Sequence, residues 1–511
     1  MKRLTGLALL ALGLVTVASA GTGYVAHPDA EGTRTLKVLG AVEGYELQDG
    51  RVTLLVRDGR TCRRVTWKIG ESESAVPAAC ARAGQPSSEA RSGATRVRLR
   101  PGAWGHPDRL VVTGPSGIRS WPLPERALHV DVDGQTAIFS TRASREVYAV
   151  DLQSGRTALV GLTRRGDTPR LNRRGLVFRD NVYKRRETDG STLMKFVPRR
   201  HLDKATRLVG EPLRVDGRIV DLAMDGSRVA LAVREWRGGC DAVVYWNIAW
   251  RYAIPITEEE ELTCAWSRRG GTIETVSLAG LRAAWVMRVG SEQRLLAASS
   301  VDCFERRVVT AQMGARERVI DHSGDSGLLA YTVARRGGSV LGKLDGRMRG
   351  DTLVSDKRMP TATAVDKRRV AVLFPNGTVE LRIERGAVTR EIVVGSARAL
   401  ALQAKHLVVL THQDTLAVFS TETGRRLSSW SVPRGVSARI DAHFGVAVLT
   451  RGKLVLAMSL RTGKRIIVAR TPTAATAAIE APGIAYASSL AARATVGFVP
   501  FARIERLLAP A

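Results

Sequence analysis

The sequence predicts an all-β protein, a seven- or eight-bladed β-propeller with an N-terminal β-rich region, preceded by a signal peptide. Turn glycines recur at spacings of 40, 38 and 39 residues, and apolar stretches of strand length flank them. No segment keeps a 3.6-residue helical period through several turns, the signal peptide and the last few residues excepted. A period of about 40 residues in a β-patterned chain indicates stacked four-stranded units. The periodic glycines are Gly346, Gly386, Gly424 and Gly463.

Residues 1–20 are predicted to be an export signal. Lys2 and Arg3 precede an apolar stretch, and residues 18–20 (ASA) fit a small-x-small cleavage site. The apolar stretch is shorter than the roughly 20 residues that a transmembrane span needs, although a retained signal anchor is the alternative. The mature chain is therefore expected to have no membrane span and to be extracytoplasmic, either secreted or associated with the cell envelope.

Residues 21–124 are predicted to form the N-terminal β-rich region, and extra blades of the same ring are the alternative for this segment. Two Asp-Gly turns, Asp49-Gly50 and Asp58-Gly59, separate Val- and Leu-rich stretches that alternate in β fashion. From residue 70 to about residue 94 the composition shifts to Ser, Ala, Gly and Glu, which is typical of a loop or linker.

Residues 125–511 are predicted to form the propeller. The first complete unit is residues 127–160, and an irregular insertion follows at about 163–213. A turn pattern [DS]-x-x-[ST]-G-[RK] recurs, in which glycine supplies the positive φ of a tight hairpin and Asp or Ser bonds nearby backbone N–H groups. Aligned on this turn, the units share strand pattern but no repeated functional side chain. Seven further units are expected to begin near residues 216, 273, 318, 362, 397, 436 and 475.

The outer-strand motifs resemble those of exported bacterial β-propeller repeat families, of the pyrroloquinoline-quinone-like and WD-repeat-like kind. The motifs are VYAVDLQSGR (147–156), LAVFSTETGRR (416–426) and LVLAMSLRTGKR (454–465). The resemblance covers roughly residues 125–511 and implies blade architecture. In the quinone-binding enzymes a tryptophan closes each repeat just past the glycine, and here only Trp430 is near such a place. No cofactor is expected on this basis.

The five cysteines suit an oxidising compartment. Cys62 with Cys80 and Cys240 with Cys264 would each close a short loop, contributing about 3 kcal/mol as disulfides. Cys303 is left over. No CxxC motif and no histidine at ligand spacing from a cysteine is present in the sequence, so no metal site is expected.

The formal charge of +29 is explained either by a solvated basic surface or by an anionic partner. Arginine supplies 66 of the 78 basic residues and is spread along the whole chain, which favours a solvated basic surface without a dedicated partner. An anionic envelope polymer or lipid head groups, attracted by the long-range field, are the alternative. Nucleic acid is not expected for an exported protein.

Three motifs contain residue types that are also found at catalytic, metal or modification sites. The GDSG in residues 324–327 is expected to be a turn, because a strand follows at once where trypsin-like proteases need a further Gly-Pro. The acidic run Glu258–Glu261 is expected to be a solvated loop, with metal binding or docking to a basic partner as the alternative. Asn376-Gly377-Thr378 fits a glycosylation sequon but is first a hairpin turn.

The most suggestive local feature is aromatic, because five of the nine tryptophans lie within fifty residues. They either fill the gaps between blades or form a binding platform for sugars and other flat ligands. The candidate platform residues are Trp236, Trp246, Trp250 and Trp266.

The sequence thus favours a non-enzymatic extracytoplasmic binding or scaffolding propeller, a monomer whose partner is an unknown protein or an anionic envelope polymer. No catalytic residue is assigned. The alternative is a propeller enzyme, either a quinone-dependent dehydrogenase or an envelope glycan hydrolase.

Overall fold

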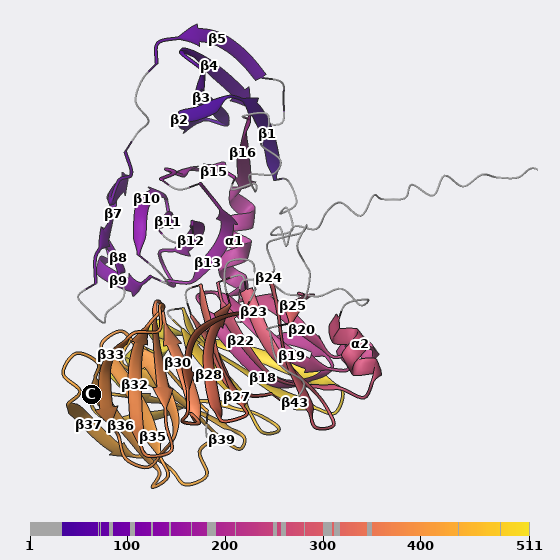
Figure 1. Cartoon of the computed structure of the whole chain (residues 1–511). Helices are drawn as coiled ribbons and strands as arrows, with labels where there is room; N and C mark the ends of the chain where they lie inside the picture. The colour runs from indigo at the N-terminus through magenta and orange to yellow at the C-terminus, as the bar shows by residue number, and fades with distance from the viewer. Residues whose placement is uncertain are drawn as a thin grey trace, which may run out of the picture.

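The structure, a computed structural model, consists chiefly of four-stranded antiparallel sheets, eleven in the part of the chain that it describes. This arrangement is consistent with an all-β propeller. The sheets fall into two groups, one above the other in Figure 1. The structure describes residues 33–509 except 70, 72, 81–84, 103–107, 124–125, 143–144, 165, 181–190, 210, 249–252, 257–261, 281, 300–308, 311–316, 326, 345–349, 438 and 481.

Seven sheets lie between residues 213 and 500 and are called the ring below. Six of them each consist of four consecutive strands, which are β18–β21, β22–β25, β26–β29, β30–β33, β34–β37 and β38–β41. The seventh has the order β17-β44-β43-β42. The strands are β17 (Leu213–Asp216), β18 (Arg218–Asp225), β19 (Arg228–Arg234), β20 (Ala242–Asn247), β21 (Ile254–Pro255), β22 (Thr272–Ala279), β23 (Arg282–Val289), β24 (Glu292–Ser299), β25 (Val309–Thr310), β26 (Arg318–Asp325), β27 (Leu328–Arg335), β28 (Gly338–Leu344), β29 (Gly350–Asp356), β30 (Ala362–Asp366), β31 (Arg369–Leu373), β32 (Thr378–Ile383), β33 (Val388–Val393), β34 (Ala397–Gln403), β35 (His406–Thr411), β36 (Thr415–Ser420), β37 (Arg426–Ser431), β38 (Ile440–His443), β39 (Val446–Arg451), β40 (Leu454–Ser459), β41 (Arg465–Arg470), β42 (Thr476–Glu480), β43 (Gly483–Leu490) and β44 (Arg493–Pro500).

The ring is closed in two ways. One strand of each sheet, called its first strand below, contacts its counterparts in the two neighbouring sheets. These contacts form a cycle in the order β18, β22, β26, β30, β34, β38, β42 and back to β18. The seventh sheet also joins the two ends of this part of the chain, since β17 pairs antiparallel with β44 from Leu213↔Val496 to Asp216↔Arg493. These first strands begin within four residues of the positions predicted for the seven later units.

Apolar side chains fill the space between neighbouring sheets. Between the sheets of β17 and β18, for example, Leu231 and Trp246 pack with Val496 and Phe498 in one buried cluster. A four-stranded sheet has two faces to cover, and stacking sheets around an axis covers both.

The other four sheets lie between residues 34 and 198 and are called the four-sheet group. Their orders are β2-β3-β4-β5, β6-β7-β8-β9, β10-β11-β12-β13 and β1-β16-β15-β14. Strand β6 contacts β10, β10 contacts β14, and β14 contacts β2. The strands are β1 (Arg34–Leu39), β2 (Ala41–Gln48), β3 (Arg51–Asp58), β4 (Thr61–Lys68), β5 (Glu73–Ala78), β6 (Glu89–Ser92), β7 (Thr95–Arg100), β8 (Arg109–Gly114), β9 (Gly117–Pro122), β10 (Ala127–Asp133), β11 (Thr136–Thr141), β12 (Glu146–Asp151), β13 (Thr157–Leu162), β14 (Arg170–Asn172), β15 (Gly175–Arg179) and β16 (Ser191–Pro198).

The boundary expected at residue 125 lies between β9 and β10, two strands of the four-sheet group. The unit predicted at 127–160 is present as β10–β13, but its first strand contacts β6 and β14, whereas the cycle of the ring begins at β18. The hairpin at Gly155 has the same turn chemistry as the hairpins of the ring. The turn pattern therefore does not indicate to which of the two groups a sheet belongs. The two Asp-Gly turns of the N-terminal region do separate β2, β3 and β4 as predicted.

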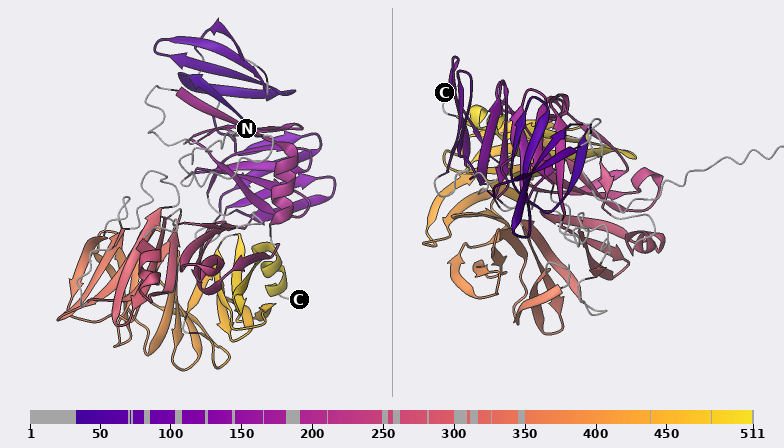
Figure 2. Two further views of the ribbon diagram at one scale, coloured as in Figure 1. Left: turned by 90° about the vertical axis from the view of Figure 1, so that its right-hand side faces the viewer. Right: turned by 90° about the horizontal axis from the view of Figure 1, so that it is seen from above.

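The helices connect or flank the sheets. Helix α1 (Arg199–Leu208) leads from β16 toward the ring and packs against β12 and β13, and α3 (Phe501–Leu508) follows β44 and contacts β9 (Figure 2). The others are η1 (Trp236–Gly238) and α2 (Leu262–Arg268). Within the described residues, no helix combines the length and apolar character that crossing a membrane would need.

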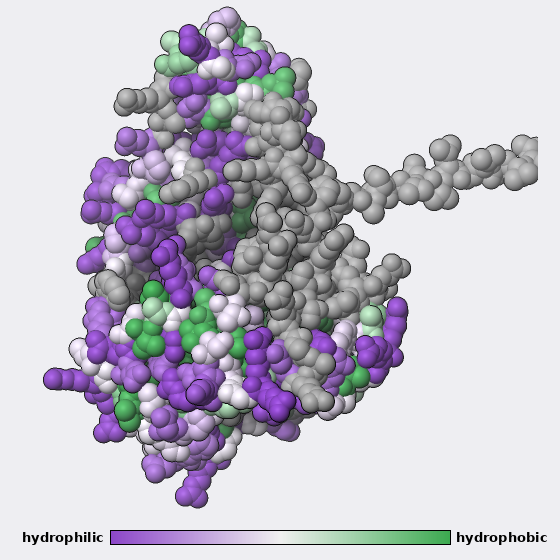
Figure 3. Space-filling view, viewed as in Figure 1, coloured by the Kyte–Doolittle hydropathy of each residue, from purple (hydrophilic) through white to green (hydrophobic). Residues whose placement is uncertain are grey.

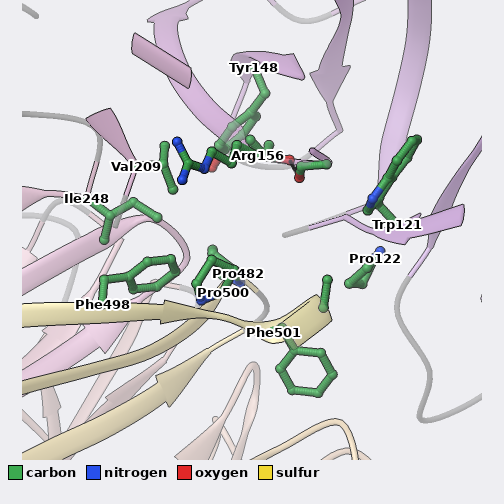
Figure 4. A pocket seen from close by; sticks show the side chains of 13 residues that line it. Trp121, Pro122, Tyr148, Arg156, Val209, Ile248, Pro482, Phe498, Pro500 and Phe501 are labelled. Carbon is green, nitrogen blue, oxygen red and sulfur yellow. Dashed lines mark hydrogen bonds between the residues drawn. The ribbon is translucent and has the colours of Figure 1, made fainter. Parts of the chain in front are cut away.

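The two groups meet at a partly apolar interface (Figure 4). A crevice of about 30 Å³ lies between Trp121 and Arg156 of the four-sheet group and Phe498 and Phe501 near the end of the ring. Beside it, Glu146 of β12 forms an ion pair with Arg228 of β19, and both side chains are at most 5% exposed.

Candidate functional site

A polar cavity of about 460 Å³ lies at the centre of the ring. Each of the seven first strands contributes to its wall, so the cavity coincides with the axis around which the sheets are arranged. Most of the polar groups in its wall are carboxylates, hydroxyls and imidazoles. The polar and charged lining residues include Asp221, Thr275, Ser277, Asp321, His322, Ser323, Asp325, Thr363, Asp366, Arg398, Gln403, Arg439, Asp441, His443 and Glu480.

Three aspartates link their first strands to the next sheet of the ring. Asp221 Oδ2 accepts a hydrogen bond from the backbone N–H of Val276 at 2.8 Å. In the same way Asp321 accepts from Thr363 at 2.6 Å, and Asp441 accepts from Ile479 at 3.0 Å. In β18 and β26 a β-bulge directly precedes the aspartate, which turns its carboxylate toward the neighbouring strand.

A second set of links lies at the other end of the first strands. Asp325 Oδ2 accepts from the backbone N–H of Lys367 at 2.8 Å, and Asp366 accepts from Ala404 at 2.9 Å. Asp225 accepts from Gly280. Each of these three carboxylates therefore has a structural partner directly after the first strand of the adjacent sheet.

His322 links β26 to β22 and contacts a serine. Its Nδ1 lies 2.7 Å from Ser277 Oγ, and its Nε2 lies 2.7 Å from Thr275 Oγ1. A Ser–His contact is also found in nucleophilic catalysis, but there a carboxylate stabilises the imidazolium through the second ring nitrogen. Here that nitrogen meets a hydroxyl, and burial lowers the pKa of His322 to about 4. The neutral imidazole is thus suited to joining two strands.

Burial shifts the ionisation of other cavity groups. It raises the pKa of Asp321 and of Asp441 to about 6, although their backbone hydrogen bonds act in the opposite direction. Burial lowers the pKa of His443 to about 3, and the charge of Lys367 acts in the same direction. His443 Nδ1 lies 3.5 Å from Glu480 Oε2 on β42.

Arg439 reaches across the cavity. From the start of β38 its guanidinium pairs with Asp221 of β18 and donates to the carbonyl oxygen of Val276 on β22 at 3.4 Å. Burial lowers the pKa of Arg439, yet 45% of its side-chain surface is accessible. The cationic head of Arg439 is therefore accessible to a ligand at the cavity.

The tryptophans proposed as a platform do not share one surface. Trp246 is fully buried in the cluster between the sheets of β17 and β18, and Trp236 packs partly buried against that cluster. Trp266 is 8% exposed and belongs to a different cluster with Trp285. Trp250 lies outside the described residues. Trp246 could contact a ligand only if the core opened.

Both predicted cysteine pairs are at disulfide distance. The Cα atoms of Cys62 and Cys80 are 5.2 Å apart, and those of Cys240 and Cys264 are 5.1 Å apart. The second pair connects the segment after η1 to α2. Cys303, like the acidic run Glu258–Glu261, lies outside the described residues.

The GDSG segment was expected to be a turn, but its first two residues, Gly324 and Asp325, are the end of β26 and contact neighbouring sheets. A Cβ atom on Gly324 would lie 2.7 Å from the carbonyl oxygen of Leu278, so glycine allows β26 to approach β22 closely. Asp325 then binds the next sheet, as described above. Asn376 accepts from the backbone N–H of Thr378 within the β31–β32 hairpin.

Two first strands of the ring share a side-chain pattern with a structural role. The pattern R-[IV]-[VI]-D-x-x-x-D occurs at residues 218–225 and again at 318–325, and both of its aspartates bind the following sheet. Alignment on the glycine of the third and fourth strands conceals this pattern, because the two signals lie at different places in each unit.

Within the described residues no group of three or more His, Cys, Asp or Glu side chains could hold a metal ion.

The fold is that of a propeller repeat protein. Among solved structures, the chain is similar to the WD40 β-propeller domain of Doa1, with 12% identity and a TM-score of 0.40, over 56% of this chain and 93% of that one. No protein-family model and no curated protein matches the chain.

Proposed function

We propose that residues 213–500 are a seven-bladed propeller and that the four-sheet group is a second domain, both following a signal peptide at residues 1–20. The closed cycle of first strands and the β17–β44 pairing support the first of these boundaries. Edman sequencing of the exported protein is expected to give a mature N-terminus at Gly21, and an N-terminus at Met1 would contradict the cleavage.

We propose further that the protein is a non-enzymatic binding or scaffolding propeller that acts outside the cytoplasm, in association with the cell envelope. One observation carries the binding role: the cavity carboxylates and His322 are engaged in holding adjacent sheets together, which makes the ring a rigid frame. The partner then meets one face of the ring near the cavity, where Arg439 is accessible. The two cysteine pairs at disulfide distance support an oxidising compartment.

A cell-wall pulldown and a glycan array with the mature protein test this function. We expect retention of an envelope component that is weakened by Arg439→Ala and unaffected by the control Arg434→Ala, an exposed arginine close by in the chain. Conversion of the captured component into a product, seen by mass spectrometry, would instead indicate the enzyme alternative. Equal retention by both variants would show that the partner does not bind at the cavity.

A further inference from the structure

Among the described residues, one face of the β6–β9 sheet packs against the neighbouring sheet, and the other has exposed side chains. On the covered face Val97, Leu99, Leu110 and Val112 pack in a buried cluster with residues of β10–β13. On β7 these apolar residues alternate with Arg96, Arg98 and Arg100, of which Arg98 and Arg100 are exposed and Arg96 keeps 45% of its side chain exposed. Because successive residues of a strand point to opposite faces, the three arginines share the outer face. Figure 3 shows hydrophilic side chains on the side of the molecule where β7–β9 lie in Figure 1.

The strand register adds two arginines to the same face. Arg91 of β6 is paired with Arg96, and Arg109 of β8 is paired with Arg100. Directly paired residues of an antiparallel sheet point to the same side, so all five belong to one surface. We call this surface the arginine face, defined by Arg91, Arg96, Arg98, Arg100 and Arg109.

The arginine face is only partly neutralised. Glu89 of β6 lies 2.6 Å from Arg96 and 3.6 Å from Arg91. Arg109 donates to Ser120, and its Nη1 lies 3.6 Å from Glu505 at the edge of the face. Glu89 is also the cross-strand partner of Arg98, but among the described residues neither Arg98 nor Arg100 has a carboxylate within ion-pair distance. Five guanidinium groups therefore meet one carboxylate on the sheet itself and a second at its margin.

We propose that the arginine face binds a linear, phosphate-bearing polymer of the cell envelope. Alternate residues of a strand are about 7 Å apart and neighbouring strands about 5 Å apart, so the guanidinium groups form a grid on a flat surface. A small anion could engage only one or two of them, whereas a chain of phosphates can engage a row. Arginine suits this role because its planar fork binds phosphate oxygens in pairs. The choice of an envelope polymer rests on the extracytoplasmic location in the proposed function.

Binding to long-chain linear polyphosphate tests the proposal with a matched pair of variants. The first is Arg96→Gln/Arg98→Gln/Arg100→Gln. The control is Arg425→Gln/Arg426→Gln/Arg461→Gln, which removes the same charge from three arginines on the surface of the ring. We expect the first to lose at least tenfold in affinity and the control less than twofold. The slope of log K against log salt should fall by about 2 in the first variant alone, which is the loss of about three phosphate contacts. Thermal unfolding confirms that both variants remain folded.

Two results would overturn the proposal. Equal losses in the two triple variants would show that net charge, not this face, holds the polymer. Tighter binding of the wild type to single-stranded DNA or to phosphatidylglycerol vesicles than to polyphosphate would assign the face to another partner. If polyphosphate is not bound while an envelope component is still captured through Arg439, the proposal fails and the proposed function stands.

Discussion

At the scale of single residues, the buried carboxylates and imidazoles of the ring have opposite effects on stability as pH changes. The pKa of Asp321 and Asp441 is about 6 in the folded protein and about 3.9 in an unfolded chain. The folded state therefore binds protons more readily, and these two groups favour folding as the pH falls from 7 toward 4. The pKa of His322 and His443 is about 4 and about 3, below the unfolded value near 6.5. These two groups disfavour folding over the same range.

Replacing the two aspartates is expected to expose the effect of the histidines. Asp321→Asn/Asp441→Asn keeps an oxygen acceptor at each site but removes its titration. Going from pH 7 to pH 5, the free energy of unfolding of this variant should fall relative to wild type, by on the order of 2–3 kcal/mol for the two groups together. Urea unfolding at pH 5, 6 and 7 measures this. His322→Gln should change the slope in the opposite direction, and parallel pH profiles for all three proteins would contradict the assignment.

At the scale of elements, the turn glycines do more than form hairpins. Gly155 and Gly463 both have φ of +72°. Each also lies under a tryptophan of the preceding sheet: a Cβ on Gly463 would lie 2.4 Å from Trp430, and one on Gly155 would lie 1.9 Å from Trp121. At Gly386 and Gly424 the corresponding neighbours include the smaller Val354 and Ile392. The same contact between consecutive sheets thus occurs in both groups.

Gly463→Ala is expected to be more destabilising than an alanine at an open turn. It combines the cost of a positive φ, about 1 kcal/mol, with overpacking against Trp430, which adds about 1–3 kcal/mol. Gly452→Ala is the control, since Gly452 has φ of +53° but an added methyl group there would have no neighbouring atom within 4 Å. In Gly463→Ala/Trp430→Val, a smaller side chain removes the clash, and stability should partly recover. Denaturant midpoints check this, and equal losses for the two single variants would contradict it.

The sequence could predict these turns because their signals are local. Asp151 or Ser459 and the glycine four residues later lie within one hairpin, and the hydrogen bonds follow the expected pattern. The links between first strands could not be found in this way. Asp221 and Val276 are 55 residues apart, and Asp321 and Thr363 are 42 apart. Nothing near an aspartate in the sequence reveals which backbone N–H group the fold brings to it.

At the scale of the whole molecule, the division into two groups depends on pairings that no local pattern carries. Strand β1 pairs with β16, and β17 pairs with β44, so each group contains a sheet assembled from distant parts of the chain. The hydrophobic alternation of each strand predicts that it belongs to a sheet but does not choose its partner. The sequence therefore could not predict the ends of the two groups, although it did predict the starts of the later units.

The ion pair between Glu146 and Arg228 is expected to hold the two groups in a fixed relation. Tyr148 also donates to Glu146 Oε2 at 2.6 Å, and Arg228 pairs with Oε1, so each carboxylate oxygen has a polar neighbour. Glu146→Gln removes the carboxylate charge that pairs with the buried guanidinium of Arg228, at a cost of about 3–5 kcal/mol. Since this cost falls on the interface, unfolding in urea should separate into two transitions, one for each group, where the wild type shows one.

A double variant distinguishes loss of the pair from loss of packing. In Glu146→Leu/Arg228→Met both charges are replaced by apolar side chains of similar length, so no buried charge remains and much of the lost stability should return. Small-angle scattering should then show wild-type dimensions for the double variant and an expanded particle for Glu146→Gln. If Glu146→Gln unfolds at the wild-type midpoint in a single transition, the pair does not couple the groups, and the apolar contacts around Trp121 and Phe501 must do so instead.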